Sequence, residues 1–136
     1  MIADLQPKFE TVMIIDDVTI DLYITSRIIT KNHFGKKVVE YSAADKALQY
    51  LQENQNNISA LPQIIFIDLY MPLFSGFDFL EAYDKLPPAL KNHCRLYILS
   101  STINGADIAS VRNNKNVVSF QLKPITKEFL DRIIAA

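Results

Sequence analysis

Five short runs of apolar residues, rich in valine and isoleucine, are spaced along the chain. They cover residues 11–15, 38–41, 64–67, 96–99 and 117–122. Most of these runs are continuous instead of alternating between apolar and polar positions. Continuous runs of this length are typical of strands that are buried on both faces of a parallel sheet. The pattern therefore predicts five strands, most of them without a solvent-facing side.

Segments long enough to form helices lie between and after these runs. We expect helices over about residues 20–31, 44–55, 76–87, 105–113 and from residue 126 onward. The first helix is expected to align four residues along one side, namely Ile20, Ile24, Arg27 and Ile28. The second carries Ala47, Leu48 and Leu51 at core spacing, whereas the fourth is short, polar and weakly amphipathic. Gly35 and the Pro87-Pro88 pair are expected to end the first and third helices.

Alternation of strand and helix, repeated five times, is characteristic of α/β folds. It predicts a doubly wound, five-stranded parallel sheet with helices on both faces. The chain has 136 residues, an ordinary size for one domain, and it contains no internal repeat, low-complexity tract or linker. We therefore expect residues 1–136 to form a single domain, with no room for a separate output domain.

Composition narrows the class of protein further. Apolar residues make up 49% of the chain and charged residues 21%, so the chain can bury a core. The formal net charge of -1 provides no basic surface for nucleic acid. No apolar run approaches the ~20 residues that span a bilayer, and the N-terminus lacks the pattern of a signal peptide. The single cysteine, Cys94, suits a reducing compartment and is expected to be a packing residue. We expect a cytoplasmic protein with neither nucleic acid nor membrane as a partner.

Reactive side chains stand at the ends of four of the five predicted strands. Asp16 and Asp17 follow the first strand, Asp68 the third, Ser100 the fourth and Lys123 the fifth. In an open parallel sheet, all carboxyl ends lie at one edge, where ligands bind at the point of strand-order reversal. We therefore expect these residues, which are far apart in the sequence, to converge on one small site.

Three carboxylates so close together repel one another, and each resists ionisation unless a cation compensates. Mg²⁺ suits such a site because it prefers a few carboxylates together with phosphate oxygens and water. Lys123 adds a positive charge and Ser100 a hydroxyl donor. A carboxylate nucleophile, a metal, a lysine and a hydroxyl are together the groups needed to hold a phosphoryl group during transfer.

These residues give the chain a resemblance to the receiver domain of two-component response regulators, over essentially its whole length. The matching residues are the pair Asp16-Asp17, Asp68, the pair Met71-Pro72, Gly76, Ser100, Phe120 and the pair Lys123-Pro124. A lone Lys-Pro pair would carry no information, but all of these elements in order form a specific pattern. The resemblance implies a flavodoxin-like sheet with strand order 2-1-3-4-5, whose switch point lies between the first and third strands.

The resemblance implies that a histidine kinase or a histidine phosphotransfer protein donates a phosphoryl group to Asp68. Mg²⁺ would be bound directly by Asp17 and Asp68, through water by Asp16, and by the backbone carbonyl of Tyr70. Lys123 would bind a phosphate oxygen. The Lys123–Pro124 peptide bond is expected to be cis.

The resemblance also implies how the phosphoryl group is sensed. Ser100 would move inward to the phosphate, and Phe120 would then change from an outward to an inward rotamer. This movement would repack the face formed by the fourth predicted helix, the fifth strand and the last helix, which a downstream protein would bind. We expect that partner to contact Phe120 or residues 103–108.

Two further positions, Tyr70 and Thr102, are placed by the resemblance along the path of the water that hydrolyses an aspartyl phosphate. Neither residue is an acid or an amide suited to orient that water, and the ring of Tyr70 can cover the entrance. We expect hydrolysis to be roughly ten- to a hundredfold slower than in fast chemotaxis-type receivers.

Several alternatives remain open at this point. Paired acids after a strand also occur merely as a favourable helix N-terminus. Haloacid-dehalogenase-type phosphatases use similar groups, but their Asp-x-Asp motif needs a second acid where this chain has Tyr70. We therefore expect no enzymatic activity beyond self-catalysed phosphotransfer and autodephosphorylation. The stronger alternative is a pseudo-receiver, a protein-binding module that keeps the fold but does not switch by phosphorylation.

Overall fold

Five parallel strands form one sheet in the computed structural model, which describes residues 6–102 and 104–135. The strands are β1 (Phe9–Ile15), β2 (Gly35–Tyr41), β3 (Ile64–Ile67), β4 (Arg95–Ser100) and β5 (Val117–Leu122). Their order across the sheet is β2-β1-β3-β4-β5, and every neighbouring pair is parallel. The predicted fold class and strand order are confirmed.

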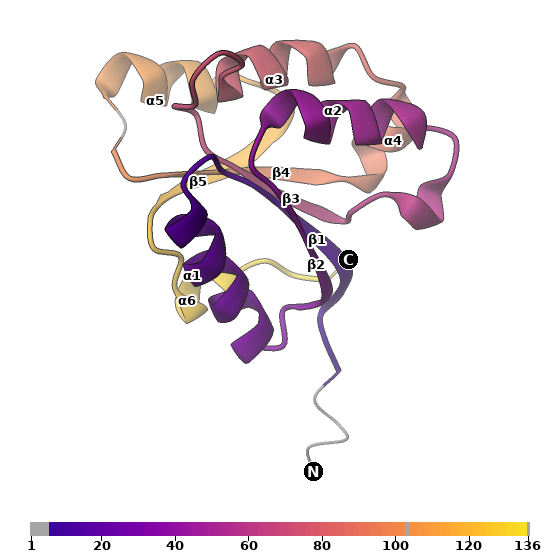
Figure 1. Ribbon diagram of the computed structural model, residues 1–136, viewed down its shortest axis with the longest axis vertical. Helices are drawn as coiled ribbons and strands as arrows, with labels where there is room; N and C mark the ends of the chain where they lie inside the picture. Colours follow the sequence, from indigo (N-terminus) through magenta and orange to yellow (C-terminus); the bar gives the residue numbers. More distant parts are fainter. Residues whose placement is uncertain (1–5, 103, 136) are drawn as a thin grey trace.

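Helices cover both faces of the sheet (Figure 1). The helices α1 (Thr19–Lys31) and α6 (Lys127–Asp131) lie on one face. The opposite face is covered by α2 (Ala44–Glu53), α3 (Gly76–Asp84), α4 (Pro88–His93) and α5 (Gly105–Arg112). A short 3-10 helix, η2 (Ile58–Ala60), precedes β3. Among the residues that the structure describes, no helix is long and apolar enough to cross a membrane.

Alternate residues of the central strands point into two separate cores. In β1, Met13 and Ile15 pack on the side of α2 and α3, whereas Val12 and Ile14 pack on the side of α1 and α6. All four residues are at most 2% exposed. Because helices cover both faces, residues 12–15 of this strand have no solvent-facing side, which explains their continuous apolar run.

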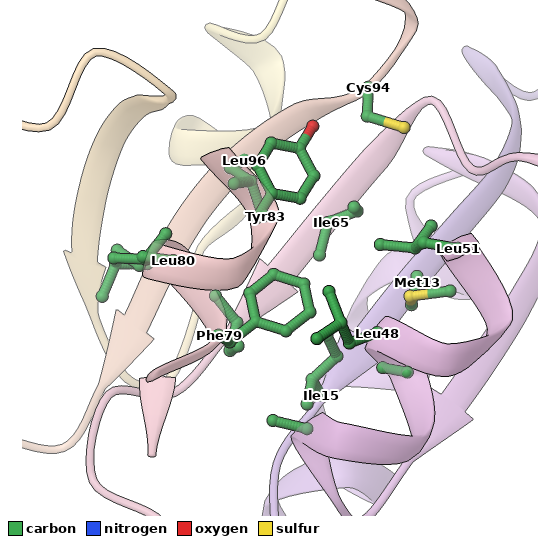
Figure 2. Packing of buried hydrophobic residues seen from close by; sticks show 14 of the residues in the cluster. Met13, Ile15, Leu48, Leu51, Ile65, Phe79, Leu80, Tyr83, Cys94 and Leu96 are labelled. Atoms are coloured by element: carbon green, nitrogen blue, oxygen red, sulfur yellow. The ribbon is translucent and has the colours of Figure 1, made fainter. Parts of the chain in front are cut away.

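Side chains of α3 close the core between this helix and the sheet (Figure 2). The rings of Phe79 and Tyr83 stack with their centroids 5.8 Å apart, and the Tyr83 hydroxyl points toward Cys94. Burial raises the pKa of the Cys94 thiol to about 12, so the thiol stays protonated near neutral pH. The prediction that Cys94 is a packing residue is confirmed.

The fifth strand covers the predicted residues 117–122 but, unlike the central strands, is not buried on both faces. β5 lies at an edge of the sheet, where Val118 is 55% and Leu122 is 47% exposed. Its pairing with β4 shifts in register between Leu96 and Tyr97, which leaves Val118 without a partner in the ladder. An edge strand has a neighbour on only one side, and the short helix α5 covers only part of its face.

The side of α1 that was expected to carry Ile20, Ile24, Arg27 and Ile28 is largely exposed, and of these residues only Ile28 packs against the core. The buried residues of this helix are Leu22, Thr25 and Ile29, whereas Ile20 is 60% and Ile24 is 39% exposed. The helix carries two apolar stripes, and the position of the sheet determines which stripe is buried. Periodicity alone could not distinguish them.

The third predicted helix ends slightly earlier than expected, and a helix that the sequence pattern did not predict follows it. α3 ends at Asp84, and α4 begins at Pro88 instead of the chain continuing as a loop. Proline at the first helical position is favourable because its missing N–H would have no intrahelical partner there. The Pro87-Pro88 pair therefore begins α4, and α3 has already ended at Asp84.

Gly35 begins β2 and does more than end the first helix. A Cβ atom on Gly35 would lie 2.6 Å from Cγ2 of Val12, so only glycine allows the chain to approach β1 so closely here. Residue 33, a histidine with φ of +54°, turns the chain between α1 and this strand.

Candidate functional site

The ends of the strands bring the predicted site residues to one edge of the sheet. Ile15 pairs with Ile67 at the ends of β1 and β3, so Asp16 and Asp68 follow adjacent strand ends. β2 lies on one side of β1 and β3 on the other, so this edge is the point of strand-order reversal. Ligands of doubly wound sheets bind in the crevice at such a point.

Three carboxylates gather in this crevice. The ligand oxygens of Asp16, Asp17 and Asp68 all lie within 4.8 Å of one another. Asp16 and Asp68 are buried, whereas Asp17 is exposed at the mouth of the crevice. An all-oxygen set of this kind fits a hard divalent cation such as Mg²⁺. The cluster that the sequence predicted is therefore present, and its composition could hold a metal ion.

The Lys123 ammonium is the positive centre of the crevice. It donates hydrogen bonds to carboxylate oxygens of Asp16, of Asp68 (2.8 Å) and of Asp21 (2.9 Å). Burial alone would lower the pKa of Lys123, but these hydrogen bonds together raise it above its ordinary value. The ammonium has three N–H donors, and each carboxylate can accept one of them. The Lys123–Pro124 peptide bond is cis, which confirms that prediction.

Asp21 is the residue of this cluster that sequence reasoning missed. It lies in the first turn of α1, and its side chain is 26% exposed. One signal was available, because an acid in the first turn of the helix after Asp16-Asp17 begins close to the same strand end. Acids are common in that position for the helix dipole alone, however, so the signal is weak.

The buried position of Asp16 shifts its ionisation. Burial raises the pKa of Asp16, and the hydrogen bond from Lys123 and one from the backbone N–H of Val18 (3.0 Å) offset this only in part. A nearby metal cation would favour the ionised form of this acid.

Hydrogen bonds hold the Asp68 carboxylate in one orientation. Oδ1 accepts the Ser100 hydroxyl (3.1 Å) and the backbone N–H of Tyr70 (3.1 Å), while Oδ2 accepts the Lys123 ammonium (2.8 Å). Ser100 is buried, at 2% exposure, and its hydroxyl contacts the predicted phosphoacceptor Asp68. A hydroxyl, a backbone amide and an ammonium therefore surround Asp68.

Gly76 allows α3 to begin close to Asp68. A Cβ atom at this position would lie 2.5 Å from the backbone oxygen of Asp68, closer than real Cβ contacts allow. The Gly76 N–H donates to the carbonyl of Leu69 (2.9 Å), and Ser75 and Asp78 form a capping box at the same helix end. The glycine of the sequence motif is thus required by packing beside the site.

Tyr70 connects the site to the start of α5. Its hydroxyl hydrogen-bonds to the carboxylate of Asp107, and this bond raises the pKa of Tyr70. Asn104 caps the same helix by accepting the Asp107 N–H (2.9 Å), and its side-chain amide donates to the Asp107 carboxylate (2.9 Å). The Tyr70 side chain is 42% exposed, and its ring lies edge-on to that of Phe77. Thr102, on the β4–α5 connection, is exposed.

Phe120 lies away from the acidic cluster, on β5. It is half-buried, pairs with Ile98 in the ladder, and has the Arg112 guanidinium 5.5 Å from its ring centroid. A groove of about 390 Å³ lies beside it between α5 and β5. The only buried residue of α5 is Val111, so this helix is held by few contacts. Residue 103, which the partner prediction includes, lies outside the described residues.

Comparison with protein families gives one match to the same residues. A family model described as the response regulator receiver domain matches residues 12–135, which covers all the site residues named above. A search of curated protein sequences found no match.

Solved structures of the same fold agree with this match. A response regulator receiver protein from Dyadobacter fermentans has a TM-score of 0.79 and 28% identity, covering 90% of this chain and 96% of its own. A two-component response regulator from Cytophaga hutchinsonii has a TM-score of 0.83 and 25% identity, covering 90% and 92%. The Vibrio cholerae chemotaxis protein CheY4, at 17% identity and a TM-score of 0.70, covers 90% and 93% and supports the fold alone.

A titration with Mg²⁺ should separate the roles of the acids. Asp17→Ala should weaken binding by at least roughly tenfold, because a charged ligand is lost from a partly solvated site. Asp21→Asn should weaken it only about two- to threefold, because Asp21 acts through Lys123 and through space. Asp45→Asn is the control, since this exposed acid lines the same pocket as Asp17. Unchanged affinity in Asp17→Ala would mean that the paired acids only favour a helix N-terminus.

Proposed function

The chain belongs to the family of response regulator receiver domains, and we propose on this basis that Asp68 accepts a phosphoryl group from a histidine kinase or a histidine phosphotransfer protein. The observation that supports this proposal most directly is the environment of Asp68. The Asp68 carboxylate belongs to an acidic cluster that could hold a metal ion. It also contacts the Lys123 ammonium and the Ser100 hydroxyl. These are the groups that phosphoryl transfer requires.

In the proposed transfer, an oxygen of Asp68 attacks the phosphorus of a phosphohistidine. The O–P bond forms, the P–N bond breaks, and the departing imidazole nitrogen recovers its electron pair. Lys123 and Ser100, which contact Asp68 directly, are placed to donate to phosphoryl oxygens. Asp17 and Asp68 would bind Mg²⁺ directly, with Asp16 through water and the Tyr70 carbonyl as a further ligand. Bound Mg²⁺ would neutralise charge on the phosphoryl oxygens.

Replacement of the acceptor tests this proposal. Wild-type protein incubated with Mg²⁺ and labelled acetyl phosphate should acquire one phosphoryl group, and Asp68→Asn should acquire none because an amide is not a competent nucleophile. The exposed acid Asp78 provides a matched control, since Asp78→Asn should label like the wild type.

Two results would contradict the assignment. Full labelling of Asp68→Asn, with the phosphate mapped to another residue, would make a different acid the acceptor. If the wild type neither labels nor binds beryllofluoride with Mg²⁺, the protein is a pseudo-receiver that binds partners without switching.

We further propose that the output surface consists of α5, β5 and α6. Three features of the structure support this: the exposed residues of β5, the groove beside Phe120, and the few contacts of α5. Elements that must move are drawn from the least stable parts of a fold. Tyr70 and Asp107 join this surface to the residues around Asp68. We expect the downstream partner to be a protein, encountered in the cytoplasm.

Amide hydrogen exchange can measure this response. Beryllofluoride with Mg²⁺ should change exchange rates in α5 and β5 by at least about threefold, because few residues of these elements are buried. Rates in residues 12–15 of β1 and in β3, which are buried, should stay constant. Changes that avoid α5 and Phe120 would contradict the proposed surface, and Asp68→Asn should show no response.

The lifetime of the phosphoryl group is proposed to depend on Tyr70 and Thr102. The Tyr70 side chain reaches toward Asp107 instead of pointing away from the site, and its backbone N–H contacts Asp68. A ring held in this position presents apolar surface to an approaching water. Slow loss of phosphate is the expected consequence.

Three variants compare the two positions. Tyr70→Asn and Thr102→Glu should each speed autodephosphorylation by roughly ten- to a hundredfold, equivalent to a barrier about 1–3 kcal/mol lower. Tyr70→Phe keeps the ring and loses the bond to Asp107, so its rate should stay close to the wild type if the ring is the shield. The measurement is the decay of labelled phosphoprotein at fixed Mg²⁺. If neither Tyr70→Asn nor Thr102→Glu accelerates decay, these residues do not control the water.

A further inference from the structure

Asp21 contacts Lys123 without belonging to the acidic cluster that could hold a metal ion. Its Oδ2 accepts a hydrogen bond from the Lys123 ammonium (2.9 Å). Among the described residues, the acids whose oxygens lie within 4.8 Å of one another are Asp16, Asp17 and Asp68. Asp21 approaches from the first turn of α1, where it lines a pocket of about 320 Å³ together with the lysine. Asp21 is thus a partner of the lysine and lies outside the metal cluster.

The helix dipole does not account for the direction of the Asp21 carboxylate. An acid in the first turn of a helix is stabilised by the N–H groups that are exposed there. Asp45 occupies the first turn of α2, and its carboxylate accepts a backbone N–H, that of Lys46 (3.0 Å). The Asp21 carboxylate instead accepts from a side chain 102 positions away in the sequence. The two acids share a position in their helices but not a type of partner.

All three N–H groups of the Lys123 ammonium are engaged by carboxylates. They donate to Asp16, Asp21 and Asp68. Phosphorylation would raise the negative charge carried by the Asp68 side chain from one to about two. A phosphoryl oxygen would take over the N–H that Asp68 now accepts, while another N–H stays on Asp21. The Asp21 carboxylate then lies on the same ammonium as the phosphoryl group, and like charges at such distances repel.

We propose that Asp21 is a positioning residue that makes the phosphorylated state less stable by holding the Lys123 ammonium; this inference rests on the proposed function. Asp21 keeps one N–H of Lys123 from the phosphoryl oxygens and offsets part of the positive charge that stabilises them. An aspartyl phosphate that is less stable gives up its phosphoryl group more readily. Asp21 therefore favours return of the group from Asp68 to a phosphotransfer histidine.

A supporting role for Asp21 is the alternative. As a second anchor besides Asp16, it would hold the ammonium beside Asp68 and strengthen binding of the phosphoryl group. The charges favour the destabilising role, because the described part of the site already holds three other carboxylates. Lys123 is also fixed without Asp21, since its side chain is only 9% exposed and contacts both Asp16 and Asp68.

Beryllofluoride binding measures this effect, because the anion bound to Asp68 carries the same charge as a phosphoryl group. The titration is followed by fluorine NMR at a Mg²⁺ concentration that saturates every variant, so that altered metal affinity does not contribute. Asp21→Asn should bind beryllofluoride at least about threefold more tightly than the wild type, because it loses the charge and keeps an acceptor. The second-order rate of labelling by acetyl phosphate should rise by a similar factor.

Three further variants separate charge from structure. Asp21→Ser is a second neutral replacement that suits the start of a helix, and it should show the same gain. Asp21→Glu keeps the charge, so its affinity for beryllofluoride should stay within about twofold of the wild type. Asp45→Asn is the matched control, because this exposed first-turn acid lies at the same edge of the sheet and lines a pocket with Asp17. It should also remain within about twofold of the wild type.

Two outcomes would overturn the inference. Equal affinity for beryllofluoride in the wild type and in both neutral variants would leave Asp21 only its effect on the helix dipole. Weaker binding in both neutral variants would make Asp21 a support for Lys123. A wild type that neither binds beryllofluoride nor is labelled by acetyl phosphate would instead refute the proposed function itself, and the inference with it.

Discussion

The site depends on one buried positive charge. The Lys123 ammonium contacts Asp16, Asp21 and Asp68, and its side chain is 9% exposed. Carboxylates packed this closely would repel one another and resist ionisation without a cation among them. Lysine offsets part of that repulsion, and the remaining negative charge is what gives the crevice its fit for a divalent ion. The alignment of strand ends in the sheet serves to bring these charges together.

The same edge of the sheet joins the site to a distant surface. Ser100 ends β4 and contacts Asp68, while Tyr70 links the residue after β3 to the N-terminus of α5 through Asp107. α5 is attached by little else, because only Val111 is buried. A change of charge at Asp68 would therefore act on contacts that hold a weakly packed helix. Under the proposed function, this arrangement would provide a physical route from phosphorylation to a change of surface.

Two positions in the turn after Asp68 show opposite relations between residue and backbone. Gly76 lacks a Cβ atom because the backbone of Asp68 leaves no space for one. Leu73 has a side chain although its positive φ favours glycine, and that side chain is fully exposed. Packing within the fold explains the glycine. Packing does not explain the leucine, which lines a small pocket together with Asp17 and Met71.

The sequence by itself determined the parallel sheet, the strand order through the resemblance, and the convergence of Asp16, Asp17, Asp68 and Lys123. Continuous apolar runs follow from burial of a strand on both faces. Residues that follow parallel strands meet at one edge of the sheet. Both features of the fold can therefore be predicted from short stretches of sequence. Only the tertiary structure decided which stripe of α1 is buried, that β5 is exposed, and that Asp21 contacts Lys123. Each of these depends on which element lies opposite at close range. Which elements lie opposite one another is decided by the packing of segments far apart in the sequence, and local periodicity carries no information about that packing.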